Sequence, residues 1–147
     1  GFRQIMILNG HGGNTAPNAV VQSDLEIKHD VKIAASPYWD IDTQALLDAT
    51  PDKFGMIPGH AGDFETSLML AAQPSLVSHN LSEISELINA SAMDAGGVPR
   101  FGIGSPAGEK HLGFTDDTRH ANAETGAELL DKAAAALATF IEIEFTE

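Results

Sequence analysis

The first part of the chain alternates short apolar runs with longer mixed ones. Residues 5–8 (Ile-Met-Ile-Leu) form an apolar run typical of a buried strand, and 31–35 are predicted to form a second strand. Between them, 16–29 mixes apolar and polar positions as an amphipathic helix does, with Pro17 near its start. A strand, a helix and a strand within about 35 residues predict a βαβ unit with parallel strands and a right-handed crossover.

Helical periodicity continues through the rest of the chain. It predicts helices at 42–50, 64–72, 82–93 and 122–145. The last is the clearest, because Asn122 can cap its start and apolar side chains recur along one face. No repeat or linker interrupts the pattern, which predicts one α/β domain over 1–147.

A histidine stands where the first predicted strand meets the first predicted helix. His11 lies within 9–14 (NGHGGN), and the glycines of this segment allow a sharp turn and a close approach to a ligand. Ligands of open α/β sheets bind beyond the carboxyl ends of the strands, where this turn would lie. The alternative is a tight strand-to-helix turn in which His11 merely caps a polar group.

The second predicted strand is followed by aromatic side chains. The segment 36–40 reads SPYWD and holds Trp39, the only tryptophan of the chain. Because parallel strands end at the same edge of a sheet, Trp39 would line the crevice beside His11. The alternative is that Trp39 only packs in the core.

A second histidine framed by glycines precedes the helix at 64–72. We expect His60 at the mouth of this helix and Asp63 as its N-cap. Glu65 falls in the first turn of a helix that is apolar nearly all round, and a buried unpaired carboxylate costs several kcal/mol or more. The amides and dipole of the helix N-terminus are one possible partner for Glu65. We favour a metal ion or a basic group.

Composition narrows the chemistry. The chain has no cysteine, which excludes disulfides and thiolate metal sites and fits a reducing, cytoplasmic setting. Its formal charge of −13 argues against nucleic acid and anionic membranes as partners. No apolar run approaches the roughly 20 residues that cross a bilayer, so we expect a soluble protein.

Histidine nitrogens and carboxylate oxygens remain as a ligand set for Zn²⁺ or Mn²⁺ in a hydrolytic site. Such a metal polarises a carbonyl and lowers the pKa of bound water towards about 7. A further histidine can then pass a proton to the leaving nitrogen.

Three blocks together resemble the creatininase (creatinine amidohydrolase) family. They are 9–14, 36–40 and 60–71, in the family's order and at its spacing. The resemblance covers essentially the whole chain but only the C-terminal part of the family, whose Glu-x-His motif and metal-bridging aspartate lie further towards the N-terminus. Since the first predicted strand begins so close to Gly1, we expect that a preceding segment is missing.

The resemblance implies a three-layer α/β fold, with a doubly wound, mainly parallel sheet flanked by helices on both faces. It also implies a binuclear Zn²⁺ or Mn²⁺ centre, a small-molecule amide substrate and a homohexamer. By the resemblance His11 and Glu65 bind metal, and His60 transfers a proton.

The same resemblance assigns the substrate side of the site. Trp39 matches an aromatic residue that covers the substrate ring, and Gly12, Gly13 and Asn14 are expected to line the substrate. Gly13 stands where creatininase proper has a glutamate, which leaves Glu65 available to the second metal. Met56 stands where a second tryptophan is expected, and this disfavours creatinine itself.

The resemblance implies a metal-dependent amidohydrolase that cleaves a cyclic amide or formamide C–N bond with metal-activated water. Half of the family's metal ligands are absent, so we expect weak metal binding and little turnover from these 147 residues alone. Formamide deformylases and a peptide-trimming hydrolase of the same superfamily are alternatives. From another class, the alternative is a non-catalytic α/β domain that binds a small molecule or forms oligomers.

Overall fold

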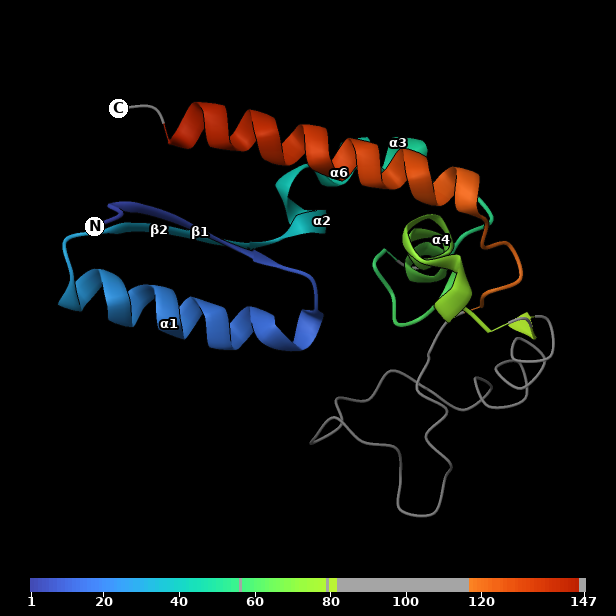
Figure 1. Ribbon diagram of the computed structural model, residues 1–147, viewed down its shortest axis with the longest axis horizontal. Helices are drawn as coiled ribbons and strands as arrows, with labels where there is room; N and C mark the ends of the chain where they lie inside the picture. The colour runs from blue at the N-terminus through green and yellow to red at the C-terminus, as the bar shows by residue number, and fades with distance from the viewer. Residues whose placement is uncertain (56, 79, 82–116, 146–147) are drawn as a thin grey trace, which may run out of the picture. The chain divides into compact units, whose positions relative to one another are not determined.

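The computed structural model describes residues 1–55, 57–78, 80–81 and 117–145 (Figure 1). The chain divides into two compact units, one formed by 1–48 with 131–147 and the other by 49–130. The helix predicted at 82–93, the glycine-rich stretch that follows it and Met56 lie outside the described residues.

Each predicted element within the described residues is present, with ends shifted by one or two positions, as is usual for element boundaries. The strands are β1 (Gln4–Asn9) and β2 (Lys32–Pro37). The helices are η1 (Gly12–Asn14), α1 (Thr15–Lys28), α2 (Tyr38–Ile41), α3 (Thr43–Ala49), α4 (Asp63–Ala72), η2 (Pro74–Leu76) and α6 (Ala123–Glu144).

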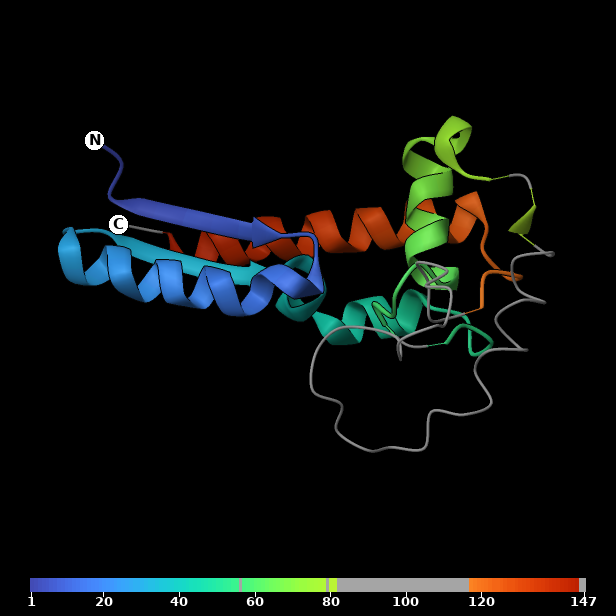
Figure 2. The same ribbon diagram turned by 90° about the horizontal axis from the view of Figure 1, so that it is seen from below.

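The first unit contains the predicted βαβ arrangement. β1 and β2 pair in parallel, from Gln4 opposite Lys32 to Asn9 opposite Pro37, and α1 connects them. Figures 1 and 2 show α1 along one face of the strands and the C-terminal part of α6 along the other. The α/β fold with helices on both faces of a parallel sheet is therefore confirmed.

The first strand is less buried than its apolar sequence predicts. Ile5 and Leu8 keep 37% and 46% of their surface exposed, because within the described residues β1 pairs with only one strand, β2. Ile33 on β2 and Leu46 on α3, by contrast, are almost fully buried.

Helix α1 contacts the strands through polar side chains. Gln22 Nε2 donates to the carbonyl of Ile33 at 2.6 Å, and Glu26 Oε1 accepts from the amide of Ile33 at 2.9 Å. Val20 and Ile27 remain 70% and 85% exposed. This helix therefore binds β2 by hydrogen bonds to its backbone and leaves large apolar side chains in solvent.

In the second unit, α4 packs tightly against the start of α6. Phe64, Ser67 and Leu129 are almost fully buried. A Cβ built on Gly126 would lie only 1.9 Å from the carbonyl oxygen of Ser67, so only glycine fits at this contact. The predicted cap of α6 is confirmed, since Asn122 Oδ1 accepts from the amide of Thr125 at 2.8 Å.

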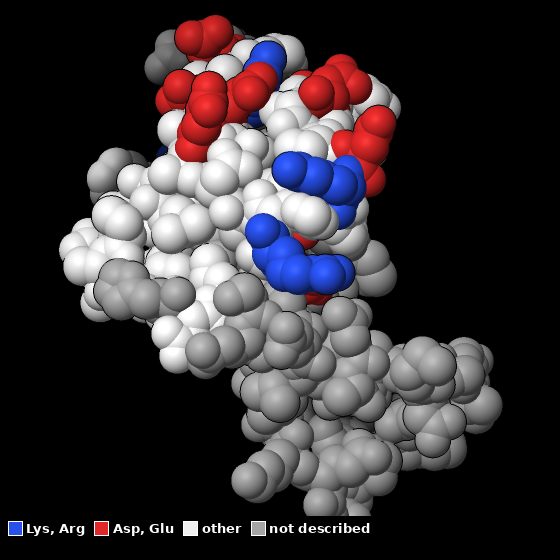
Figure 3. Space-filling view, turned by 90° about the vertical axis from the view of Figure 1, so that its right-hand side faces the viewer, with Lys and Arg blue, Asp and Glu red and all other residues white. Residues whose placement is uncertain are grey.

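The surface reflects the acidic composition. Figure 3 shows acidic side chains gathered in clusters on the face that it draws. None of the described helices is long and apolar enough to cross a membrane.

Candidate functional site

The turn after β1 is organised by the side chain of Asn9. Asn9 is only 4% exposed. Its Oδ1 accepts from the amide of His11 at 3.0 Å, and its Nδ2 donates to the carbonyl of His11 at 2.8 Å and to Thr15 Oγ1 at 3.3 Å. A side-chain amide thus binds both backbone groups of His11 and fixes the backbone that carries the imidazole.

The imidazole of His11 is exposed and lies against Gly13. A Cβ built on Gly13 would be 3.0 Å from His11 Nε2 and 3.2 Å from its Cδ2, whereas nothing other than adjacent residues lies within 4 Å of a Cβ on Gly10 or Gly12. Any larger residue at position 13 would therefore have to displace the imidazole.

Trp39 is buried, with 8% of its surface exposed. Its ring meets that of Tyr38 edge to face, with centroids 4.9 Å apart, and its carbonyl accepts from Thr43 Oγ1 at 2.9 Å. This environment is what the packing interpretation predicts. Contact of Trp39 with a substrate stays a prediction.

His60 lies in a turn with unusual backbone geometry. Gly59 has φ 62° and Ala61 has φ 53°, so the exposed His60 is flanked by two residues in the left-handed region. For a residue with a Cβ this conformation costs roughly 1–2 kcal/mol. The turn therefore depends on the contacts that hold Ala61.

Those contacts come from the first turn of α4. Glu65 Oε2 accepts from the amide of Ala61 at 2.6 Å, and Thr66 Oγ1 donates to its carbonyl at 3.3 Å. Both polar backbone groups of Ala61 are thus bound by side chains only four and five residues away. The strained turn and the helix behind it form one local structure.

Glu65 is half-buried rather than deeply buried. Its hydrogen-bond partner is the amide of Ala61, which immediately precedes Gly62, the N-cap of α4. This bond gives one carboxylate oxygen a backbone partner just before the helix, while a metal ion or basic group as a further partner stays a prediction.

The prediction that Asp63 caps α4 is wrong. Gly62 is the N-cap and Asp63 is the first helical residue. Asp63 Oδ1 instead accepts from the amide of His120 at 2.8 Å, across 57 residues of sequence. A local pattern could not reveal this partner.

Asp63 has the most buried carboxylate among the described residues, with 2% of its surface exposed. Its Oδ2 has no hydrogen-bond partner within the described part of the chain. Burial raises the pKa of Asp63 above its ordinary value of 3.8, and the nearby charge of Asp117 adds to this, while the amide and the side chain of His120 act in the opposite direction.

Ser67 extends the same set of contacts. Its Oγ donates to the carbonyl of Asp63 at 2.6 Å and accepts from the amide of Asn122 at 3.0 Å. With Gly126 packed on the carbonyl of Ser67, the first two turns of α4 are tied closely to 120–126.

The described residues do not fit a complete metal centre. No group of three or more His, Cys, Asp or Glu side chains within the described ranges could hold a metal ion. His11 belongs to the first unit, and His60 and Glu65 belong to the second. The structure brings His60 and Glu65 into one local turn, and it does not determine where His11 lies relative to them.

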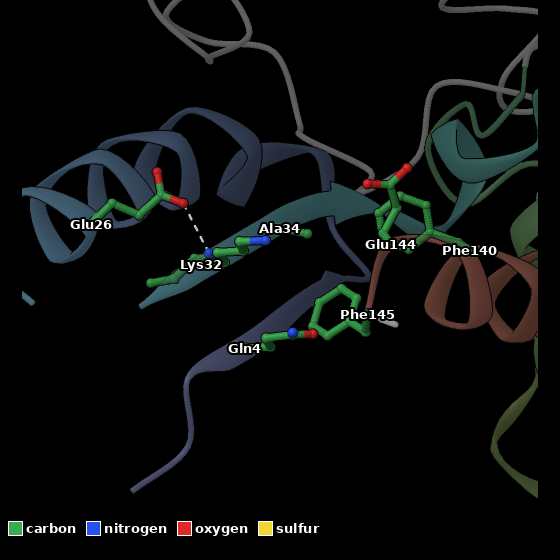
Figure 4. Close-up of a pocket in the computed structure, with 8 residues that line it drawn as sticks. Gln4, Glu26, Lys32, Ala34, Phe140, Glu144 and Phe145 are labelled. Carbon is green, nitrogen blue, oxygen red and sulfur yellow. Dashed lines mark hydrogen bonds between the residues drawn. The ribbon is translucent and has the colours of Figure 1, made fainter. Parts of the chain in front are cut away.

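A separate cavity of about 270 Å³ lies in the first unit near the amino ends of the strands (Figure 4). It is lined by Gln4, Glu26, Lys32, Ile33, Ala34, Phe140, Glu144 and Phe145. None of the residues predicted for the site lines it. His11 follows the carboxyl end of β1, the opposite end of the strand from Gln4.

Comparison with known proteins places the chain in a family. The family model described as Creatininase, creatinine amidohydrolase, matches residues 1–141. This chain belongs to the creatininase family. It is 35% identical over 88 residues to the creatinine amidohydrolase of Pseudomonas putida, a match that covers 52% of this chain and 33% of that protein.

Solved structures of creatininases share the fold. A crystal structure of creatinine amidohydrolase (creatininase) matches with a TM-score of 0.66 and 25% identity, covering 100% of this chain and 58% of that one. A structure described as Creatininase Mn matches with a TM-score of 0.65 and 24% identity, covering 99% of this chain and 58% of that one. The chain thus spans little more than half the length of these creatininases.

Proposed function

We propose that this chain belongs to a metal-dependent amidohydrolase of creatininase type that cleaves a non-peptide amide bond, either a cyclic amide or a formamide. The observation that carries the proposal is the left-handed turn at His60, held by Glu65. Backbone strain of this kind clusters at functional sites. Here it presents an exposed imidazole in a chain that a creatininase family model matches almost throughout.

In this proposal His60 transfers a proton to the leaving nitrogen, a role that an imidazole can fill in hydrolysis. His11 and Glu65 contribute a nitrogen and an oxygen ligand to a Zn²⁺ or Mn²⁺ site. Since the described residues supply no complete ligand set, we propose weak metal binding and little turnover for the 147 residues alone.

The substrate is proposed to be a small amide that lies along Gly12, Gly13 and Asn14 and reaches Trp39. All three residues of η1 are exposed, and nothing other than the adjacent residues lies within 4 Å of a Cβ on Gly12. We also propose a homohexameric, cytoplasmic enzyme with no nucleic-acid or membrane partner, on family membership and the charge of −13.

Isothermal titration with Mn²⁺ and with Zn²⁺ tests the metal assignment. The native chain should bind weakly, and His11→Ala and Glu65→Gln should each weaken binding further. His29→Ala is the matched control, because His29 is an exposed histidine at the C-cap of α1. Titrations of His11→Ala and Glu65→Gln that match those of the native chain would overturn the assignment.

A second candidate is a non-catalytic α/β domain that keeps the fold and binds a small molecule. The burial of Trp39 and the local hydrogen bond of Glu65 favour it. Release of amine from a formamide by the metal-supplemented chain, lost in His60→Ala, supports the hydrolase. Release by both proteins that does not exceed the rate with metal alone favours the non-catalytic domain.

A further inference from the structure

Asp63 is a buried carboxylate that the proposed reaction does not use. Only 2% of its surface is exposed, and one of its two oxygens has no hydrogen-bond partner within the described residues. A buried polar atom without a partner is destabilising. The other oxygen, Oδ1, accepts a hydrogen bond from the amide of His120 at 2.8 Å, which offsets part of this cost.

The residue that makes this contact belongs to the same helical turn as Glu65, which holds the backbone next to His60. Asp63 is the first residue of α4, and Glu65, two residues later, accepts from the amide of Ala61. Asp63 thus fixes the start of the helix on the side of His120, and Glu65 fixes the backbone that precedes the helix.

Ser67, one turn later on α4, adds a second hydrogen bond between this helix and the segment that contains His120. Its hydroxyl bonds both the carbonyl of Asp63 and the amide of Asn122. Asp63 and Ser67 therefore bind backbone amides two residues apart in the chain. Two such bonds resist rotation of α4 about its axis, which a single bond would allow.

We propose that Asp63 is a positioning residue: its hydrogen bond to the amide of His120 sets the orientation of the first turn of α4, so that Glu65 can hold Ala61 in the left-handed conformation and direct His60. The role of His60 and Glu65 in a reaction rests on the proposed function. The mechanical link from Asp63 to Ala61 does not depend on it.

Amide hydrogen exchange of Asp63→Ala and Asp63→Asn, followed by NMR, tests this link. Asparagine keeps an oxygen that can accept from His120, whereas alanine does not. In Asp63→Ala the amides of His120 and Ala61 should both exchange about tenfold faster, the equivalent of roughly one lost hydrogen bond. In Asp63→Asn both should stay close to native, so that the conservative variant rescues the turn.

Two controls separate a local increase in exchange at Ala61 from destabilisation of the whole unit. The amide of Leu129 in α6 should keep its native exchange rate in both variants. Asp52→Ala removes an exposed aspartate of the same unit and should leave Ala61 unchanged. If Asp63→Ala does not fold, Ser67→Ala replaces it and is expected to raise exchange at Ala61 while Asp63→Asn does not.

Faster exchange at His120 with native exchange at Ala61 would overturn the proposal, because Asp63 would then anchor only its direct partner. Equal acceleration in Asp63→Asn and the alanine variant would overturn it as well, because an oxygen acceptor would not suffice. The experiment uses neither metal nor substrate, so its failure is distinguishable from failure of the proposed function.

Discussion

The two histidine turns framed by glycines look alike in the sequence and differ in how the fold supports them. The turn at His11 is held by Asn9, two residues away, and open space surrounds Gly10 and Gly12. The turn at His60 is held by Glu65 and Thr66, and its helix is tied to a segment 57 residues distant. A local turn can adapt to a ligand, whereas a turn supported at long range is set by folding of the whole unit.

The largest expected effect is a difference in stability between two glycine substitutions, one at the start of α6 and one in the turn at His11. Gly126→Ala places a Cβ against the backbone of Ser67, at a contact that has no flexible side chain to move aside. We expect the free energy of unfolding to fall by about 3 kcal/mol. Urea titration measures it. Gly10→Ala is the control beside His11 and should cost much less, and equal losses would remove the distinction.

Asn9→Ala should have the next largest effect. It removes three hydrogen bonds from a side chain that is 4% exposed, so we expect a loss of about 2 kcal/mol. Asn14→Ala is the matched control, because Asn14 makes no side-chain capping bond and should cost less than about 0.5 kcal/mol. Similar unfolding midpoints for the two variants would show that Asn9 does not organise the turn.

Burial of Asp63 should make the stability of the chain depend on pH. Because burial raises its native pKa above 3.8, the folded state binds its proton more tightly than the unfolded state. The penalty carried by the charged carboxylate therefore disappears as the pH falls through the raised pKa and past 3.8.

The free energy of unfolding of the native chain, minus that of Asp63→Asn, should accordingly rise on acidification from pH 7. Urea titration at several pH values measures this difference. Ser67→Ala removes no titrating group, so its difference from the native chain should stay constant. A difference for Asp63→Asn that is flat or shrinks on acidification would contradict the assigned burial.

The smallest effect is expected at Ala61. Ala61→Gly removes the strain of φ 53°, so the variant should match the native stability or exceed it by less than about 1 kcal/mol. In an exposed helix position the same change should destabilise by about 1 kcal/mol, and Ala134→Gly in α6 provides that comparison. Equal losses in the two variants, measured by thermal unfolding, would argue against a strained turn at His60.

The parts of the molecule that the sequence predicts are those governed by near neighbours. Helix periodicity, the cap by Asn122 and the order of β1, α1 and β2 all depend on residues close in the chain, and all are confirmed. The bond between Asp63 and His120 depends on packing of distant segments, which no local pattern encodes.

The sequence predicts the burial of apolar side chains less well, because burial also depends on distant segments. The apolar run at 5–8 predicted an enclosed strand, and the apolar positions of α1 predicted an inward face, yet both leave large side chains exposed. Apolar content indicates that a segment can be buried. Which face is covered depends on the neighbouring elements.

The central claim is the proposal that His11 and Glu65 each contribute a metal ligand in a creatininase-type amidohydrolase. NMR spectra of the chain titrated with Mn²⁺ test it most directly, since the paramagnetic ion broadens the signals of nearby groups. The account predicts that the signals of His11 and Glu65 both broaden saturably, that Ile27 stays sharp, and that His11→Ala and Glu65→Gln each raise the Mn²⁺ concentration needed for half-maximal broadening. Broadening at only one of the two residues, or a midpoint left unchanged by both substitutions, would contradict it.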